Sequence, residues 1–220
     1  FPDALLLAER QNIFTRQQFK DGLFEVQDAG SQLIAPFLKV EPGMRVIDAC
    51  AGAGGKTLHL AALMQNKGRI IAMDTEGWKL DELKKRARRA GVGNIEPRVI
   101  ESSKTIKRLE NSADRLLLDV PCSGLGVIKR NPDAKWKLSP EFIERVKDLQ
   151  QHILEDYTTM VKPGGLVVYS TCSLLPSENE KQVLAFLESK KDSFELVDQK
   201  WILPSEGYDG FYMALIKRIK

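Results

Sequence analysis

The sequence predicts a doubly wound α/β domain with a mostly parallel sheet that ends in an antiparallel β-hairpin. Three observations predict this fold class. Short apolar runs alternate with amphipathic segments from residue 44 onwards, the first run ends in a glycine-rich turn, and no helical pattern separates the last two runs. Short apolar strands between amphipathic helices are typical of a parallel sheet that is covered on both faces.

The composition fits one domain with its own core, because 43% of the 220 residues are hydrophobic and no tract is biased. No apolar run approaches the ~18–20 residues of a membrane span. We therefore expect a cytoplasmic protein with no membrane partner, and we expect a monomer. No signal peptide is visible, and the chain opens at Phe1, so an N-terminal RNA-binding domain ahead of it remains an open question.

The cysteines argue against two kinds of site, and the net charge leaves the kind of partner open. Three cysteines at unlike spacings, with no CxxC, predict neither a disulfide framework nor a zinc site, and they fit a reducing compartment. We expect no bound metal. The net charge of +3 permits a polyanionic partner but does not require one.

The first 40 residues are interpreted as a helical lead-in that packs on the core of the domain formed by residues 41–220. Residues 27–38 carry apolar side chains at helical spacing. Asp28 or Ser31 can cap that helix, although Pro36 is unfavourable in its middle.

The central elements follow in order from the alternation of patterns. We expect β-strands at residues 44–47, 69–73, 97–100, 115–120 and 166–170. We expect helices between them at residues 56–65, 76–90, 104–109 and 139–161. Ser139 and Pro140 suit the cap and first turn of the long helix, and KPGG at 162–165 is expected to end it.

The last quarter of the chain is expected to change character. SENE at 177–180 is interpreted as a capping box that opens a helix running to about residue 190. Residues 194–203 and 211–219 then read as two strands with a Pro- and Gly-containing connection. This pair forms the expected terminal hairpin.

The glycine-rich segment DACAGAGGKT (48–57) is read as a strand end, a tight turn and a helix N-terminus that bind a nucleotide-type ligand. A Walker A loop would need glycine where Cys50 stands, and a GxGxxG fingerprint meets Thr57 in place of its third glycine. The third candidate is S-adenosylmethionine (SAM), which has no phosphate. SAM needs an acid after the second strand, and Asp74 stands there, although NAD sites share that feature.

Two further cysteines follow the fourth and fifth predicted strands, in DVPCSG (119–124) and STCS (170–173). Ligands of open α/β sheets bind at the carboxyl ends of the strands, so Asp119, Cys122 and Cys172 are expected to converge beside the cofactor. Two thiols and a carboxylate suit methylation of cytosine C5, because a thiolate that adds to C6 makes C5 nucleophilic. Cys50 alone is interpreted as a small buried apolar residue.

These segments carry a resemblance to a known family. DACAGAGGKT (48–57) is close to DxCAAPGGKT, DVPCSGLG (119–126) to DAPCSGxG, and YSTCSLLPSENE (169–180) to YSTCSxxPxENE. RNPDAKW (130–136) and DGFYMA (209–214) look like two further motifs. The chain resembles, over essentially its whole length, the RsmB/Sun family of SAM-dependent RNA cytosine-5 methyltransferases, whose Rossmann-like class I sheet ends in an antiparallel hairpin.

The resemblance implies a role for each site residue. Cys172 would be the nucleophile, Cys122 would assist product release, Asp119 would contact the base, and Lys56 would lie between cofactor and substrate. The residues implied to bind SAM are Cys50, Ala51, Gly52, Ala53, Gly54, Gly55, Lys56, Asp74, Lys79, Glu101 and Asp119. Ala53 replaces the usual proline of the first motif, and Glu101 replaces the usual aspartate near the adenine.

The implied partner is RNA, with ribosomal RNA favoured over transfer RNA. Candidate phosphate contacts follow the 119–126 segment directly, and they are Lys129, Arg130, Lys135 and Lys137, with Trp136 available to stack on a base. The basic run at 84–89 is interpreted as a solvated helix face. The alternatives left open are a DNA cytosine-5 methyltransferase, a non-catalytic RNA-binding assembly factor and an NTPase.

Overall fold

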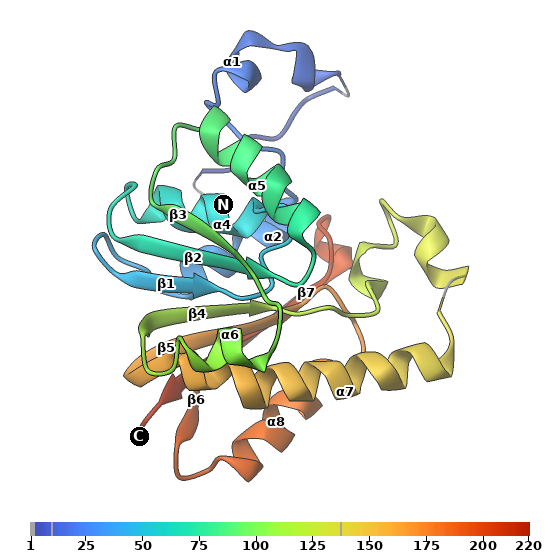
Figure 1. Ribbon diagram of the computed structural model, residues 1–220. Helices are drawn as coiled ribbons and strands as arrows, with labels where there is room; N and C mark the ends of the chain where they lie inside the picture. The colour runs from blue at the N-terminus through green and yellow to red at the C-terminus, as the bar shows by residue number, and fades with distance from the viewer. Residues whose placement is uncertain (1–2, 10, 137) are drawn as a thin grey trace.

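The computed structural model describes residues 3–9, 11–136 and 138–220, and within them it shows a seven-stranded sheet with helices on both faces (Figure 1). The strand order is β3-β2-β1-β4-β5-β7-β6. The strands are β1 (Arg45–Asp48), β2 (Arg69–Asp74), β3 (Ile95–Val99), β4 (Ala113–Asp119), β5 (Val161–Thr171), β6 (Phe194–Ile202) and β7 (Phe211–Arg218). β7 pairs antiparallel with both β5 and β6, whereas β1 to β5 pair in parallel. The predicted fold class is confirmed.

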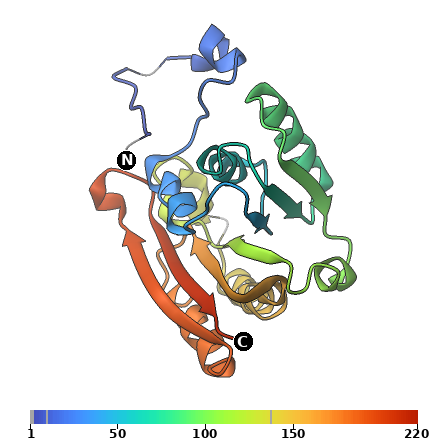
Figure 2. The ribbon, with the colours of Figure 1, turned by 90° about the vertical axis from the view of Figure 1, so that its left-hand side faces the viewer.

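The described residues form four longer helices, four short helices and five 3-10 turns. The longer ones are α4 (Gly55–Leu63), α5 (Gly77–Arg89), α7 (Pro140–Tyr157) and α8 (Glu180–Ser189), and the short ones are α1 (Gln17–Lys20), α2 (Ala29–Gln32), α3 (Ile34–Phe37) and α6 (Ser103–Lys107). The 3-10 turns are η1 (Ile13–Thr15), η2 (Leu125–Val127), η3 (Pro132–Trp136), η4 (Thr158–Met160) and η5 (Pro204–Glu206). Figure 2 shows β6 and β7 at one end of the sheet and the N-terminal segment rising above it.

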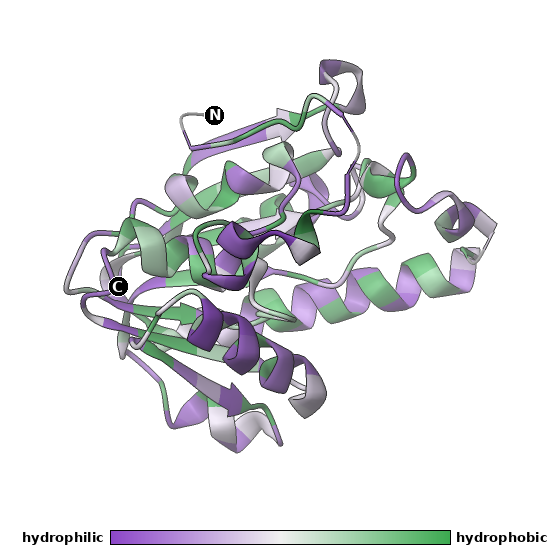
Figure 3. Ribbon diagram, turned by 90° about the horizontal axis from the view of Figure 1, so that it is seen from above, coloured by the Kyte–Doolittle hydropathy of each residue, from purple (hydrophilic) through white to green (hydrophobic). Residues whose placement is uncertain are grey.

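The core lies on both faces of the sheet because successive strand residues point to opposite sides. Ile47 of β1 belongs to the core cluster that includes residues of α6, α7 and α8, whereas its neighbour Val46 belongs to the cluster that includes residues of α3 and α4. Both side chains are fully buried, and burial of each contributes about 1.5–3 kcal/mol to the free energy of unfolding. Helix α7 alternates hydrophobic and hydrophilic residues along its length (Figure 3), as a helix with one face on the sheet should.

Residues 27–38 form two short helices, α2 and α3, in place of the single helix expected. Asp28 caps α2, since its Oδ1 accepts hydrogen bonds from the backbone N–H groups of Gly30 and Ser31. Pro36 is the third residue of α3, a first-turn position that needs no intrahelical N–H donor. Ile34 and Leu38 are fully buried against α4 and the sheet.

The structure differs from the prediction that the basic run at 84–89, which lies on α5, forms a solvated face. Arg86 and Arg89 both form ion pairs with Glu25 of the N-terminal segment, and Arg86 also donates a hydrogen bond of 2.9 Å to the backbone oxygen of Ala53. The guanidinium of Arg89 stacks over Phe19 at 4.0 Å. These two side chains therefore tie the N-terminal segment to α5, and the expected exposure holds for Lys84 and Lys85.

Two predicted boundaries are wrong for tertiary reasons. Helix α7 ends at Tyr157, and β5 already begins at Val161, which pairs with Ala113 before residues 162–165 break the register. The predicted capping box at 177–180 does not form. Such a box needs Ser177 at the cap and Glu180 in the first turn, whereas helix α8 begins only at Glu180 and its cap residue Asn179 makes no side-chain cap bond.

Candidate active site

The glycine turn after β1 forms one wall of the candidate site. Gly52 and Gly54 both adopt left-handed backbone conformations, with φ of 53° and 87°, which glycine adopts without strain. A Cβ on Gly54 would lie 2.6 Å from Cγ of Leu83 on α5. The turn therefore packs so closely on α5 that only glycine fits there.

The acid predicted after β2 lies beside this turn. One carboxylate oxygen of Asp74 accepts a hydrogen bond of 2.9 Å from the Gly52 N–H, and the other accepts one of 2.9 Å from the Glu76 N–H. Val99 of β3 pairs with Asp74, so Glu101 follows two residues beyond that point and is exposed. Lys79 donates to Glu76 at 2.8 Å and lies within the same edge of the site.

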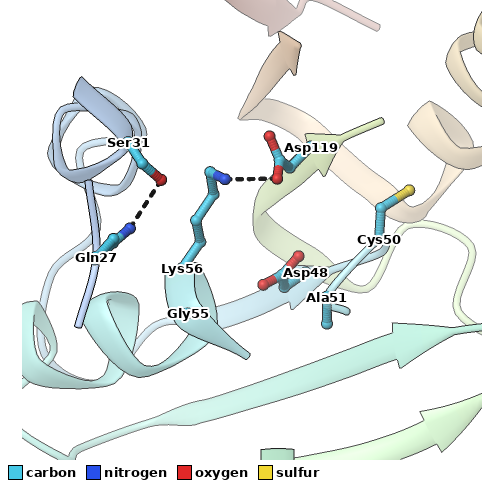
Figure 4. Close-up of a pocket in the computed structure, with 8 residues that line it drawn as sticks. All are labelled: Gln27, Ser31, Asp48, Cys50, Ala51, Gly55, Lys56 and Asp119. Carbon is cyan, nitrogen blue, oxygen red and sulfur yellow. Dashed lines mark hydrogen bonds and ion pairs between the residues drawn. The ribbon is translucent and has the colours of Figure 1, made fainter. Parts of the chain in front are cut away.

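The turn, β1, β4 and the N-terminal helices enclose a cavity of about 110 Å³. Lys56 extends from the start of α4, and its Nζ donates a hydrogen bond of 2.6 Å to Oδ2 of Asp119 at the end of β4 (Figure 4). Burial lowers the pKa of Lys56, but the charge and hydrogen bond of Asp119, together with the charge of Asp48, outweigh burial, so the net pKa lies above its ordinary value. Lys56 is therefore held as a cation inside the site.

Three further residues line this cavity that the sequence analysis did not assign to the site: Gln27, Ser31 and Asp48. The side chain of Gln27 donates to Ser31 at 3.0 Å (Figure 4). The sequence could have indicated Asp48 as a site residue, because this acid ends the first strand. Gln27 and Ser31 resemble the segment that precedes the family's cofactor domain, but no site role was assigned to them from the sequence, because they reach the cavity only through the packing of the N-terminal segment on α4.

Asp48 has one satisfied and one unsatisfied oxygen. Its Oδ2 accepts a hydrogen bond of 2.7 Å from the Thr57 hydroxyl, whereas its Oδ1 is buried and has no partner among the described residues. Burial raises the pKa of Asp48 to about 7, with the Asp119 charge adding to the effect and the Thr57 bond opposing it. A buried acceptor without a donor lines the cavity, and a ligand that carries a donor would satisfy it.

The two loop cysteines meet as predicted, with their Sγ atoms 3.2 Å apart. The pKa of Cys172 is lowered from its ordinary value, chiefly because the Cys122 thiol donates a hydrogen bond to its sulfur, with Lys56 and Arg130 adding positive charge nearby. The pKa of Cys122 is raised well above its ordinary value by the same contact and by burial. The pair therefore favours a thiolate at Cys172 and a thiol at Cys122.

Removing the Cys122 thiol should raise the pKa of Cys172, because the thiolate then loses its hydrogen-bond donor. In Cys122→Ala, the pH at which Cys172 is half-alkylated by iodoacetamide should move upwards, and alkylation at neutral pH should slow. Cys122→Ser keeps an O–H donor and should move that midpoint less. An unchanged midpoint in Cys122→Ala would contradict the hydrogen-bond account.

The residues predicted to contact RNA lie in the loop after β4. Lys129, Arg130, Lys135 and Trp136 are all exposed, and Lys135 Nζ lies 4.8 Å from the centre of the Trp136 ring. Arg130 also forms an ion pair with Asp209, a residue that is only 4% exposed. The predicted contact Lys137 lies outside the described residues.

A second cavity, of about 680 Å³, lies between the N-terminal segment and α4. It is lined mainly by apolar side chains and contains none of the acids or cysteines at the strand ends, so it is not the candidate site. Among the residues placed in the structure, no group of three or more His, Cys, Asp and Glu side chains is arranged to hold a metal ion. None of the helices placed is long and apolar enough to cross a membrane.

The strand order with an antiparallel seventh strand, the glycine turn after β1 and the acid after β2 define a Rossmann-like methyltransferase domain. The family model "16S rRNA methyltransferase RsmB/F" matches residues 35–217. The chain belongs to the RsmB/F methyltransferase family, and the resemblance stated from the motifs is confirmed.

Known relatives agree with this assignment. The chain is 38% identical to the probable ribosomal RNA small subunit methyltransferase B of Synechocystis sp., over 99% of this chain and 53% of the relative. It is 37% identical to the ribosomal RNA small subunit methyltransferase B of Klebsiella pneumoniae, over 99% of this chain and 52% of the relative. The chain thus spans about half the length of these curated relatives.

Two solved structures have a fold similar to that of this chain. The chain matches NSun6 from Pyrococcus horikoshii, solved with SFG, with a TM-score of 0.87 at 27% identity, over 96% of this chain and 57% of that one. It matches a methyltransferase homologue from the same organism with a TM-score of 0.84 at 32% identity, over 96% and 73% of the two chains.

Proposed function

We propose that this chain transfers a methyl group from SAM to C5 of a cytosine in small-subunit ribosomal RNA. The observation that carries the proposal is the pair of thiols from Cys122 and Cys172, 3.2 Å apart, at the sheet edge that also bears the Lys56–Asp119 ion pair. Relatives at 37–38% identity are ribosomal RNA small subunit methyltransferases, and the NSun6 neighbour was solved with SFG, a SAM analogue.

The residues at the strand ends suit SAM. The unpartnered Oδ1 of Asp48 would accept a hydrogen bond from the α-ammonium group, and the backbone from Cys50 to Lys56 would surround the methionine end. Asp74 would accept from the ribose hydroxyls, since each of its oxygens keeps a lone pair beyond its backbone bond. Lys79, Glu101 and Asp119 complete the proposed cofactor site. Bound SAM supplies a methyl group on a sulfonium centre.

Because Asp48 has a pKa of about 7, SAM affinity should depend on pH. The α-ammonium group requires the carboxylate form, so the Kd for SAM should rise as pH falls below 7, by up to about tenfold per pH unit. Asp48→Asn should bind SAM more weakly near pH 8 and lose the pH dependence, as measured by calorimetry. A variant that kept the same slope would show that another group titrates.

The proposed reaction begins at Cys172. Its thiolate would add to C6 of the cytosine, which forms a C6–S bond and shifts electron density to C5. Asp119 would accept a hydrogen bond from the exocyclic amino group, and Lys56 would offset the negative charge that develops on the ring. C5 is then electron-rich enough to take the methyl group.

Release of the product would use Cys122. Loss of the C5 proton to a base restores the C5–C6 double bond and breaks the C6–S bond, which returns the electron pair to the sulfur of Cys172. The Cys122 thiol, already within hydrogen-bond distance of that sulfur, would stabilise the departing thiolate. The raised pKa of Cys122 keeps this donor protonated while Cys172 reacts.

The loop after β4 would hold the RNA. Lys129, Lys135 and Lys137 would contact phosphates, and Trp136, which is 79% exposed, would stack on an unpaired base. Arg130 is 62% exposed despite its ion pair with Asp209, so it retains N–H donors for a phosphate.

The test is incubation with methyl-labelled SAM and small-subunit ribosomal RNA, followed by hydrolysis to nucleosides and mass spectrometry. The proposal predicts label in 5-methylcytidine. Label in another nucleoside would refute the assigned chemistry, transfer to DNA but not RNA would favour the DNA enzyme, and RNA binding without transfer would favour a non-catalytic assembly factor.

A further inference from the structure

The two cysteine loops come from different strands, and little regular structure joins them beyond the sheet. The last β4–β5 pair is Asp119 with Ser170, followed by one hydrogen bond of 3.0 Å from the Val120 N–H to the Ser170 oxygen. Cys122 lies three residues past Asp119 and Cys172 two residues past Ser170, yet their sulfur atoms approach to 3.2 Å. The Gly126 N–H also donates a hydrogen bond of 2.8 Å to the Cys172 oxygen. Within the described residues, 121–123 make no backbone hydrogen bond to the Cys172 loop, so another contact must hold them against it.

Glu178 makes that contact. The residue is fully buried, and its carboxylate accepts hydrogen bonds from the Ser123 N–H at 2.7 Å and from the Ser173 hydroxyl at 2.5 Å. Ser123 directly follows Cys122, and Ser173 directly follows Cys172. One carboxylate therefore bridges the residues that adjoin the two thiols.

A second residue joins the bridge from α7. The Gln150 amide donates one hydrogen bond to Glu178 Oε2 at 3.1 Å and another to the Pro121 oxygen at 2.9 Å. Gln150 is also fully buried. The Cys122 loop is thus held on both sides of the cysteine, at Pro121 and at Ser123.

Glu178 receives its hydrogen bonds from neutral groups. The Ser173 hydroxyl donates to Glu178, so the Ser123 hydroxyl, 3.0 Å from Ser173 Oγ, must donate to Ser173 in turn. All three groups on Glu178 are neutral donors, an arrangement that fits an ionised carboxylate. No cation among the described residues forms an ion pair with this buried carboxylate, which is unfavourable, so its presence points to a constraint that an apolar residue would not supply.

We propose that Glu178 is a positioning residue that holds the Cys122 and Cys172 loops at the separation needed for catalysis. Its importance for methyl transfer rests on the proposed function of the two cysteines, but its effect on their separation does not. The hydrogen bonds of Glu178 to Ser123, Ser173 and Gln150 are called the brace below.

The test measures thiol separation without using activity. Diamide oxidises two adjacent thiols to a disulfide and is itself reduced to the hydrazine, and peptide mass mapping identifies the Cys122–Cys172 product. Glu178→Ala should slow this oxidation about tenfold or more and slow single-turnover methyl transfer about 100-fold, with RNA affinity unchanged. Glu188→Gln, an exposed carboxylate on α8, is the matched control and should behave as wild type.

A conservative variant separates positioning from general destabilisation. In Glu178→Gln the amide oxygen can accept from Ser123 and Gln150, and the amide nitrogen can donate to Ser173 if the two serine hydroxyls reverse direction. This variant should therefore recover most of the oxidation rate and of the methyl transfer. If Glu178→Ala does not fold, as judged by circular dichroism, Ser173→Ala removes one donor and should slow both processes in the same direction.

The outcomes are distinguishable. Folded Glu178→Ala or Ser173→Ala protein with wild-type oxidation and transfer rates would overturn the proposal. Slowed oxidation in these variants, in a protein that methylates no RNA even as wild type, would support the brace while refuting the proposed function. Slowed transfer with unchanged thiol oxidation would also overturn the brace, because Glu178 would then act by another route.

Discussion

Cys172→Ala is expected to abolish methyl transfer, with a rate loss on the order of 10⁴-fold or more, since the neighbouring Cys122 has a raised pKa and stays a thiol. The substitution removes a small, partly buried side chain, so the fold and the affinity for SAM should persist. Single-turnover transfer of labelled methyl groups to RNA, with both substrates saturating, gives the measurement.

Cys50→Ala is the matched control for this prediction. Cys50 also follows a strand end and lines the cavity of about 110 Å³, but burial raises the pKa of its thiol well above the ordinary value. Because Cys50 lines the cavity but stays a thiol, Cys50→Ala should change the affinity for SAM more than the methyl-transfer rate at saturation. Retention of full activity by Cys172→Ala would remove that residue from the mechanism.

Asp119→Asn should have the second largest effect, a loss of about 10²–10³-fold in the single-turnover rate. Asp119 accepts hydrogen bonds from Lys56 at 2.6 Å and from the Ser170 hydroxyl at 2.9 Å. The amide keeps the size of the side chain but removes the charge, so Lys56 is left in a largely buried position without its counter-ion. The Lys56 ammonium then becomes easier to deprotonate, and both polar contacts to the base weaken.

Asp114→Asn provides the control for charge removal on the same strand. Asp114 lies near the other end of β4, where it accepts hydrogen bonds from the Arg45 N–H and from Lys162. Its loss should lower stability slightly and leave the single-turnover rate unchanged. Equal rate losses in Asp114→Asn and Asp119→Asn would mean that the effect is structural.

The sequence predicted the fold and the convergence of the site because both follow from local patterns. Continuous apolar runs marked the buried strands, and each motif stood at a strand end, so the parallel sheet alone brings Asp74, Asp119, Cys122 and Cys172 to one edge. The Sγ–Sγ distance of 3.2 Å is a direct consequence of that topology together with the brace at Glu178.

The features that the sequence did not predict depend on distant partners. Residues 177–180 match the pattern of a capping box, but the helix begins at Glu180, and Glu178 accepts a hydrogen bond from Ser123, 55 residues away. Helical spacing made Arg86 read as solvated, whereas Glu25, 61 positions earlier, pairs with it. The unpartnered Oδ1 of Asp48 is visible only once the cavity around it exists. In each case a tertiary contact overrides a local signal.

The most direct test of the proposed chemistry is trapping with RNA that carries 5-fluorocytosine in place of cytosine, in the presence of SAM. Fluorine at C5 cannot leave as a proton does, so the last elimination fails and the enzyme remains joined to the RNA. The account predicts a covalent complex that survives denaturation, with the RNA attached to Cys172 in peptides analysed by mass spectrometry. Attachment to Cys122, or no complex from a protein that binds both SAM and RNA, would contradict it.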